Sequence, residues 1–121
     1  MKKLALCAFF LAGSLLAQQS ETVMVKYHAK PGSETELARV IEKHWKTVSG
    51  LKLVRDTPHV MVQGTEGGKT YFVEIFTWRD GNTPDSAPPA IQSIWAEMGK
   101  LVEARGGRPG IDFVEVSVVT P

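Results

Sequence analysis

The sequence predicts an α+β fold of the ferredoxin-like type, with the element order β-α-β-β-α-β. Three observations lead to this prediction: the order of the periodic segments, a length that allows one core, and a third strand that is apolar on both faces. Such a chain forms a four-stranded antiparallel sheet with two helices on one face. The opposite face of the sheet then needs a cover of its own.

The first seventeen residues have the layout of a secretory signal peptide. Lys2 and Lys3 give a positive start, an apolar run follows, and Ala17 is a small residue suited to cleavage. The run is shorter than the about 20 apolar residues that cross a bilayer. Of the alternatives, lipidation of Cys7 leaves too short an apolar core, and a buried first helix lacks a helical period. We therefore expect a periplasmic or secreted protein with one domain over residues 18–121 and no membrane contact after cleavage.

Charge and cysteine content exclude several functions of the mature chain. Cleavage removes Lys2 and Lys3 and no acidic residue, so twelve basic and thirteen acidic side chains remain and the net charge changes from +1 to −1. This balance gives no electrostatic basis for nucleic-acid binding. The only cysteine is Cys7, so disulfides, thiolate metal sites and cysteine nucleophiles are also excluded.

The first strand and the first helix follow from a change of hydrophobic period. Residues 22–29 alternate apolar and polar side chains, as a half-buried strand does. A helix is expected over residues 34–48, with Ser33 and Glu36 forming a capping box and Gly50 ending it. Its apolar stripe comprises Leu37, Val40, Ile41, His44, Trp45 and Val48.

Strands two and three are expected to form a hairpin over residues 59–63 and 71–78, joined by a glycine-rich turn. A connector over residues 51–56 precedes it, and Pro58 is expected to begin the second strand. The third strand is apolar on both faces, which predicts a central position with cover on both sides.

The second helix is expected from Pro88 or Pro89 to Arg105, because proline is tolerated in a first turn and Gly106-Gly107 stops the pattern. The last strand is expected over residues 111–119, where valines alternate. The apolar second sheet face then predicts a homodimer joined sheet to sheet, since the chain has no further element to cover it.

The stretch FVEIFTW over residues 72–78, followed by a polar loop and a helix, resembles the third strand of antibiotic biosynthesis monooxygenase-like domains in the dimeric α+β barrel superfamily. The resemblance covers essentially all of residues 18–121 and implies the same dimeric barrel. Members include cofactor-free oxygenases, haem-degrading enzymes, isomerases and proteins without known activity, so fold alone does not settle function. The haem-degrading members resemble one another in an asparagine, a tryptophan and a histidine. In this sequence only the tryptophan has a counterpart, which is Trp78. No cofactor is predicted.

Two polar residues interrupt the apolar pattern and are the candidate catalytic residues. His44 lies on the buried stripe of the first helix, and Glu74 lies between Phe72 and Phe76 on one strand face. A buried carboxylate needs a partner or a raised pKa. The structural alternatives are that His44 is a hydrogen-bonded core residue and that Glu74 belongs to an ion pair. The ion-pair candidates are Arg105, Arg55 and Lys26, and the expected pocket residues are Trp45, His59, Phe76, Trp78 and Trp95.

These candidates support two functions of different kinds. One is a cofactor-free oxygenase or isomerase acting on a small aromatic or polyketide-like compound, with His44 or Glu74 removing a proton. The other is a non-catalytic dimeric binding or assembly module with a small or collapsed pocket. A metal site formed by His44, His59 and Glu74 is a third option that suits a divalent transition metal, although the three residues come from three different elements. We therefore predict no bound metal ion.

Overall fold

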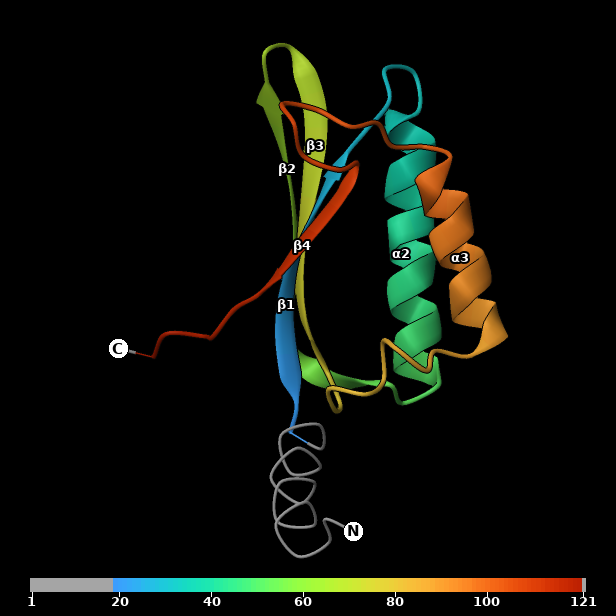
Figure 1. The fold of residues 1–121 in the computed structure, drawn as a ribbon, viewed down its shortest axis with the longest axis vertical. Coiled ribbons are helices and arrows are strands. Elements are labelled where there is room, and N and C mark those ends of the chain that lie inside the picture. Colours follow the sequence, from blue (N-terminus) through green and yellow to red (C-terminus); the bar gives the residue numbers. More distant parts are fainter. Residues whose placement is uncertain (1–18, 121) are drawn as a thin grey trace, which may run out of the picture.

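In the computed structural model, which describes residues 19–120, one antiparallel sheet packs against two helices (Figure 1). The predicted signal peptide lies outside the described residues. The strand order is β2-β3-β1-β4, which confirms the ferredoxin-like fold class. In chain order the elements are β1 (Glu21–His28), α2 (Glu34–Gly50), β2 (Val54–Glu66), β3 (Lys69–Trp78), α3 (Pro89–Gly99) and β4 (Ile111–Glu115). Neither of these helices has the length and apolar character needed to span a membrane.

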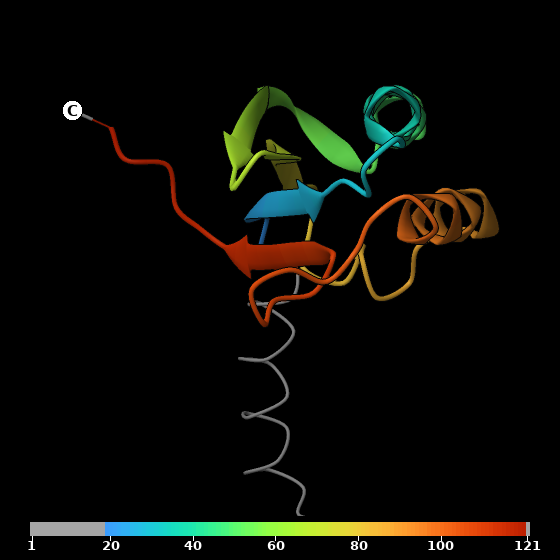
Figure 2. The same ribbon diagram turned by 90° about the horizontal axis from the view of Figure 1, so that it is seen from above.

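The core lies between the helices and one face of the sheet, and both helices cover that face (Figures 1 and 2). The register of β1 against β3 places Val23 opposite Phe76 and Tyr27 opposite Phe72. These side chains are buried with Leu37 of α2. Because side chains alternate along a strand, the register assigns every second residue of β1 and β3 to this inner face.

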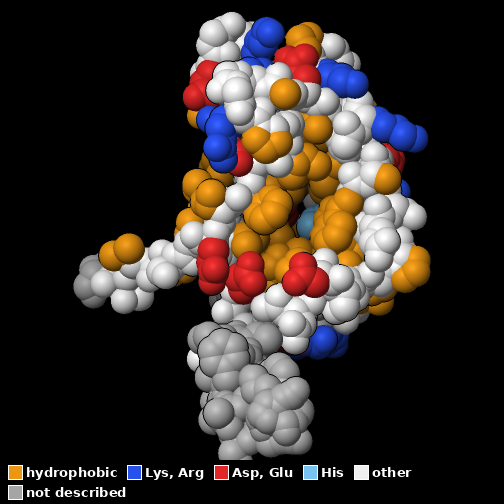
Figure 3. All heavy atoms as spheres, in the orientation of Figure 1, with side chains coloured by type: hydrophobic (Ala, Val, Ile, Leu, Met, Phe, Trp, Pro, Cys, Tyr) orange, Lys and Arg blue, Asp and Glu red, His pale blue; other side chains and the backbone are white. Residues whose placement is uncertain are grey.

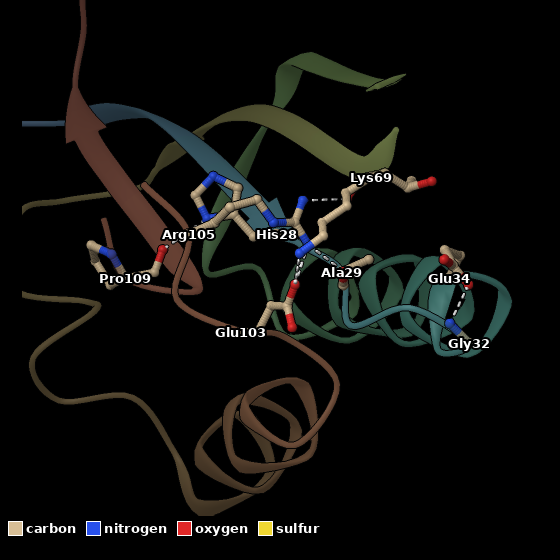
Figure 4. A network of polar contacts seen from close by, with 9 residues as sticks. His28, Ala29, Gly32, Glu34, Lys69, Glu103, Arg105 and Pro109 are labelled. Carbon is tan, nitrogen blue, oxygen red and sulfur yellow. Dashed lines mark hydrogen bonds and ion pairs between the residues drawn. The ribbon is translucent and has the colours of Figure 1, made fainter. Parts of the chain in front are cut away.

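Helix α3 ends at Gly99 and does not continue to Arg105 as predicted. The segment after it pairs with the end of β1, where Lys30 N–H donates to Leu101 O and Glu103 N–H donates to His28 O, both at 2.9 Å. The Arg105 guanidinium donates to Ala29 O at 2.6 Å and pairs with Glu103 at 2.9 Å (Figure 4). Backbone pairing with β1 thus replaces the last turns of the predicted helix. The apolar spacing alone could not distinguish a continued helix from such a paired segment.

Three further local predictions differ from the structure. Strand β2 begins at Val54 rather than at His59, with an irregular register between these two residues. Strand β4 ends at Glu115 rather than at Val119, because its partner β1 begins at Glu21 and the last bond joins Val116 N–H to Thr22 O. Ser33 precedes α2 but makes no side-chain cap bond. The predicted capping box is therefore absent, and Glu36 pairs with Arg39 instead.

The outer face of the sheet is apolar and is left uncovered by the described residues. The register places Met24 beside Ile75 and Val114, and places Val60 beside Ile75. The large apolar side chains Met24, Val60, Val62 and Val114 are between 37% and 51% exposed. Residues 116–120 leave the sheet and extend away from the body of the protein (Figure 1). The strand β3 is therefore apolar on both faces, as predicted, but residues 19–120 cover only its inner face.

Candidate functional site

A cavity of about 270 Å³ lies on the inner face of the sheet, between the strands and α3. Its size is close to the lower end of ligand pockets, roughly 300–1,000 Å³. The walls are largely aromatic and come from four elements: Tyr27 of β1, Phe76 and Trp78 of β3, Trp95 of α3 and Phe113 of β4. The space-filling view shows a hollow with hydrophobic walls between the strands and the helices (Figure 3).

The cavity exists because the helices do not cover β4. Phe113 is opposite Val25 in the sheet, so its side chain projects to the same inner face. Yet Phe113 is 67% exposed, whereas Val25 is buried. The inner face is thus closed over β1 and β3 and open along β4, where a ligand has access.

His44 lies at this cavity on the inner side of α2 and is only 2% exposed. Trp95 Nε1–H donates a hydrogen bond to His44 Nε2 at 3.0 Å. In the neutral ring the proton is therefore on Nδ1, which is buried and has no hydrogen-bond partner among residues 19–120. Burial lowers the pKa of His44 to about 4. The residue is a neutral hydrogen-bond donor, and its basic nitrogen is already occupied.

Glu74 is fully buried and does not line this cavity. Tyr27 O–H donates to Glu74 Oε1 at 2.9 Å, and His59 Nε2 lies 3.2 Å from Oε2. Burial raises the pKa of Glu74, while the bonds from Tyr27 and His59 oppose this rise. Burial, followed by the charge of Glu74, raises the pKa of Tyr27 well above its usual value.

The cations considered as partners of Glu74 have other positions. Lys26 pairs with Glu66 at 2.9 Å, and Arg105 pairs with Glu103. Arg55 is exposed and has no ion pair with a described residue. A phenol and an imidazole, rather than a guanidinium or an ammonium, therefore hold this carboxylate.

The predicted site residues form two clusters on either side of Phe76. His44, Phe76, Trp78 and Trp95 line the cavity. Trp45 and His59 do not line it, and their rings stack at a centroid distance of 3.7 Å beside Glu74. His44 therefore does not join His59 and Glu74, and no three His, Cys, Asp or Glu side chains in the described part of the chain are placed to hold a metal ion.

Sequence reasoning missed several residues that line the cavity, among them Tyr27, Phe113, Glu21 and Asp85. The sequence did indicate an inward position for Tyr27, because this residue alternates in phase with the buried Val23 and Val25. Phe113 alternates in phase with Ile111 in the same way. Glu21 and Asp85 had no such indication, because a carboxylate at a strand end or in a loop is ordinarily a solvated side chain.

Comparison with known proteins shows a likeness of fold. No family model and no curated protein matches the chain. Among solved structures, the chain is similar to the structure of Rv0793 from Mycobacterium tuberculosis, with a TM-score of 0.61 and 12% sequence identity. The match covers 85% of this chain and 98% of that chain. At this identity the likeness extends to the small α+β architecture with its four-stranded antiparallel sheet.

Proposed function

We propose that this chain is an exported protein that binds a small, largely apolar molecule in the cavity beside His44. The ligand carries an oxygen that accepts a hydrogen bond from His44 Nδ1–H. The observation that carries this proposal is the buried Nδ1, which has no partner among residues 19–120, in a residue that lines an aromatic cavity. A buried donor without a partner costs about 1–3 kcal/mol, and a ligand acceptor recovers part of that cost.

The identity of the donor also limits the chemistry of the ligand. Because His44 Nε2 accepts from Trp95 and the pKa of His44 is about 4, the ring stays neutral near pH 7. It thus favours a carbonyl or ether oxygen and has no charge with which to attract an anion. The surrounding aromatic rings favour a flat apolar body.

A matched pair of probes tests this proposal directly. Acetophenone and ethylbenzene have similar shapes, but only acetophenone has a carbonyl oxygen. We expect the mature protein to bind acetophenone about tenfold more tightly, since a hydrogen bond to a buried group contributes roughly 1–3 kcal/mol. Titrations followed by NMR chemical shifts give both dissociation constants. Native mass spectrometry of protein recovered from the periplasm or the medium reports the cleaved mass and any retained ligand.

The variant His44→Phe keeps an aromatic ring and removes the donor, so it should reduce the preference for acetophenone to near unity. The matched control is His28→Gln, because His28 is also buried but bonds Pro109 O and does not line the cavity. It should retain the preference. Equal binding of the two probes by the unmodified protein would contradict a role for His44 in recognition.

Catalysis is a second candidate function, and the observation that favours it is the bond between Tyr27 and Glu74. Tyr27 lines the cavity and also donates to a carboxylate whose pKa is raised by burial. A proton taken from a bound ligand and returned at another atom is a complete isomerisation that needs no co-reactant. Oxygenation of the resulting carbanion, as in the cofactor-free oxygenases that residues 72–78 resemble, requires O₂ as a second substrate. Loss of turnover in Glu74→Gln with retained probe binding would support this function over binding alone.

We also propose that a second copy of this chain covers the outer face of the sheet. The support is the continuous apolar register of Met24, Ile75, Val60 and Val114, together with the extended residues 116–120, which carry two exposed valines away from the body. A symmetric pair of such faces is self-complementary, and stable interfaces bury roughly 1,200–2,000 Å².

Sedimentation at micromolar concentration should therefore give twice the mass of the mature chain. A charge in the centre of the face should dissociate the dimer, because it would be buried there without a partner. Met24→Glu is the suitable variant, and Ser93→Glu on the exposed side of α3 is the control, because it also adds a single negative charge. A monodisperse monomer of the unmodified protein would refute the proposed dimer.

A further inference from the structure

The mouth of the cavity carries a group of acidic side chains. Glu21 and Asp85 line the cavity, and the charge of Glu115 is close enough to act on Glu21. The space-filling view shows acidic side chains in a row beside the opening (Figure 3). Among residues 19–120, none of these three carboxylates forms an ion pair.

The carboxylates produce a negative potential at the opening. The pKa of Glu21 is raised by partial burial and then by the charges of Glu115 and Asp85. Carboxylates that repel one another at a cavity mouth are stabilised when a cation arrives. The aromatic walls act in the same direction, because the faces of Trp78 and Trp95 attract an ammonium group.

The buried part of the cavity has a different character. Histidine atoms are visible at the floor of the hollow, and His44 is the histidine that lines it (Figure 3). His44 is 2% exposed, and its Nδ1 has no partner among the described residues. The cavity is therefore polarised, with a neutral donor inside, aromatic walls between, and carboxylates at the mouth.

We infer that the cavity takes a small aromatic amine, whose ammonium group lies at Glu21, Asp85 and Glu115 and whose inner end carries an oxygen facing His44. This inference rests on the proposed binding function and adds the charge of the ligand to it. An anion of the same shape is disfavoured by the same carboxylates. A neutral molecule of the same shape gains only the contacts with the walls and with His44.

Three probes of one shape separate these cases: para-methoxyphenethylamine, para-methoxyphenethyl alcohol and para-methoxyphenylpropionate. We expect the amine to bind about tenfold more tightly than the propionate at low ionic strength, with the alcohol between them. The preference should fall as salt is added, because the Debye length shortens from about 30 Å at 0.01 M to about 3 Å at 1 M. Calorimetric titration of the mature protein measures all three.

The double variant Glu21→Gln/Asp85→Asn should lose most of the preference for the amine over the alcohol. The control Glu42→Gln/Asp56→Asn removes the same charge from residues that do not line the cavity, and should keep the preference. Binding of all three probes with equal affinity, or tightest binding of the propionate, overturns the inference and leaves the binding function standing. Binding of none of them overturns both.

Discussion

The protein is expected to lose about 3 kcal/mol of unfolding free energy through His44 alone as the pH falls from 6.5 towards 4. In the folded state burial lowers the pKa of His44 from 6.5 to about 4. Between these two values the unfolded chain binds a proton and the folded chain does not, so stability decreases with falling pH. A difference of this size in pKa corresponds to about 3 kcal/mol. The contribution of His44 to the unfolding free energy is fully present above pH 6.5.

Urea denaturation at several pH values checks this expectation. His44→Phe carries no titrating group, so its unfolding free energy should decline less between pH 6.5 and 4 than that of the unmodified protein, whatever its stability at pH 7. The pH dependence is the diagnostic quantity, because the substitution also removes the acceptor of Trp95 Nε1–H. His28→Gln should keep the steep decline. Parallel pH profiles for His44→Phe and the unmodified protein would show that His44 is not the group responsible.

Replacing Glu74 by leucine should destabilise the protein by about 1–3 kcal/mol at pH 7, whereas Glu74→Gln should cost much less. Leucine leaves the Tyr27 hydroxyl buried without its acceptor, and the cost of a buried unsatisfied polar group has this size. Glutamine retains a carbonyl oxygen for Tyr27. The contrast between the two variants therefore separates the hydrogen bond from the charge.

The charge of Glu74 has its own signature in the pH dependence. Because burial raises the pKa of Glu74 above 4.5, the folded chain holds this proton more tightly than the unfolded chain. The contribution of Glu74 to stability therefore falls as the pH rises above 4.5 through the raised pKa, which is opposite to the effect of His44. The unfolding free energy of Glu74→Gln should therefore rise relative to that of the unmodified protein over this pH interval.

Thermal and urea unfolding of both Glu74 variants at pH 5 and pH 8 measure these effects. Tyr27→Phe is the partner control: combined with Glu74→Leu it should cost less than the sum of the single changes, because the two groups share one bond. Equal losses for glutamine and leucine would show that the carboxylate charge, rather than the bond to Tyr27, is what the fold requires.

The sequence by itself determined the order of the elements, the apolar character of both faces of β3, and the presence of His44 and Glu74 inside the apolar pattern. These properties depend on local periodicity, since alternation in β1 and the spacing of three and four residues in α2 are set by backbone geometry. Element ends were less well determined. The end of α3 depends on the pairing of residues 101–103 with residues 28–30, and the end of β4 depends on where β1 begins.

Only the tertiary structure decided which of the polar residues share a site. His44 and Glu74 both point inward, yet Phe76 lies between their clusters, and Glu74 reaches the cavity only through Tyr27. The partners of Glu74 lie 47 and 15 residues away in the chain, and the acidic mouth combines a strand end, a loop and the last strand. Such groupings follow from register and helix packing over long separations, and local periodicity carries no information about them.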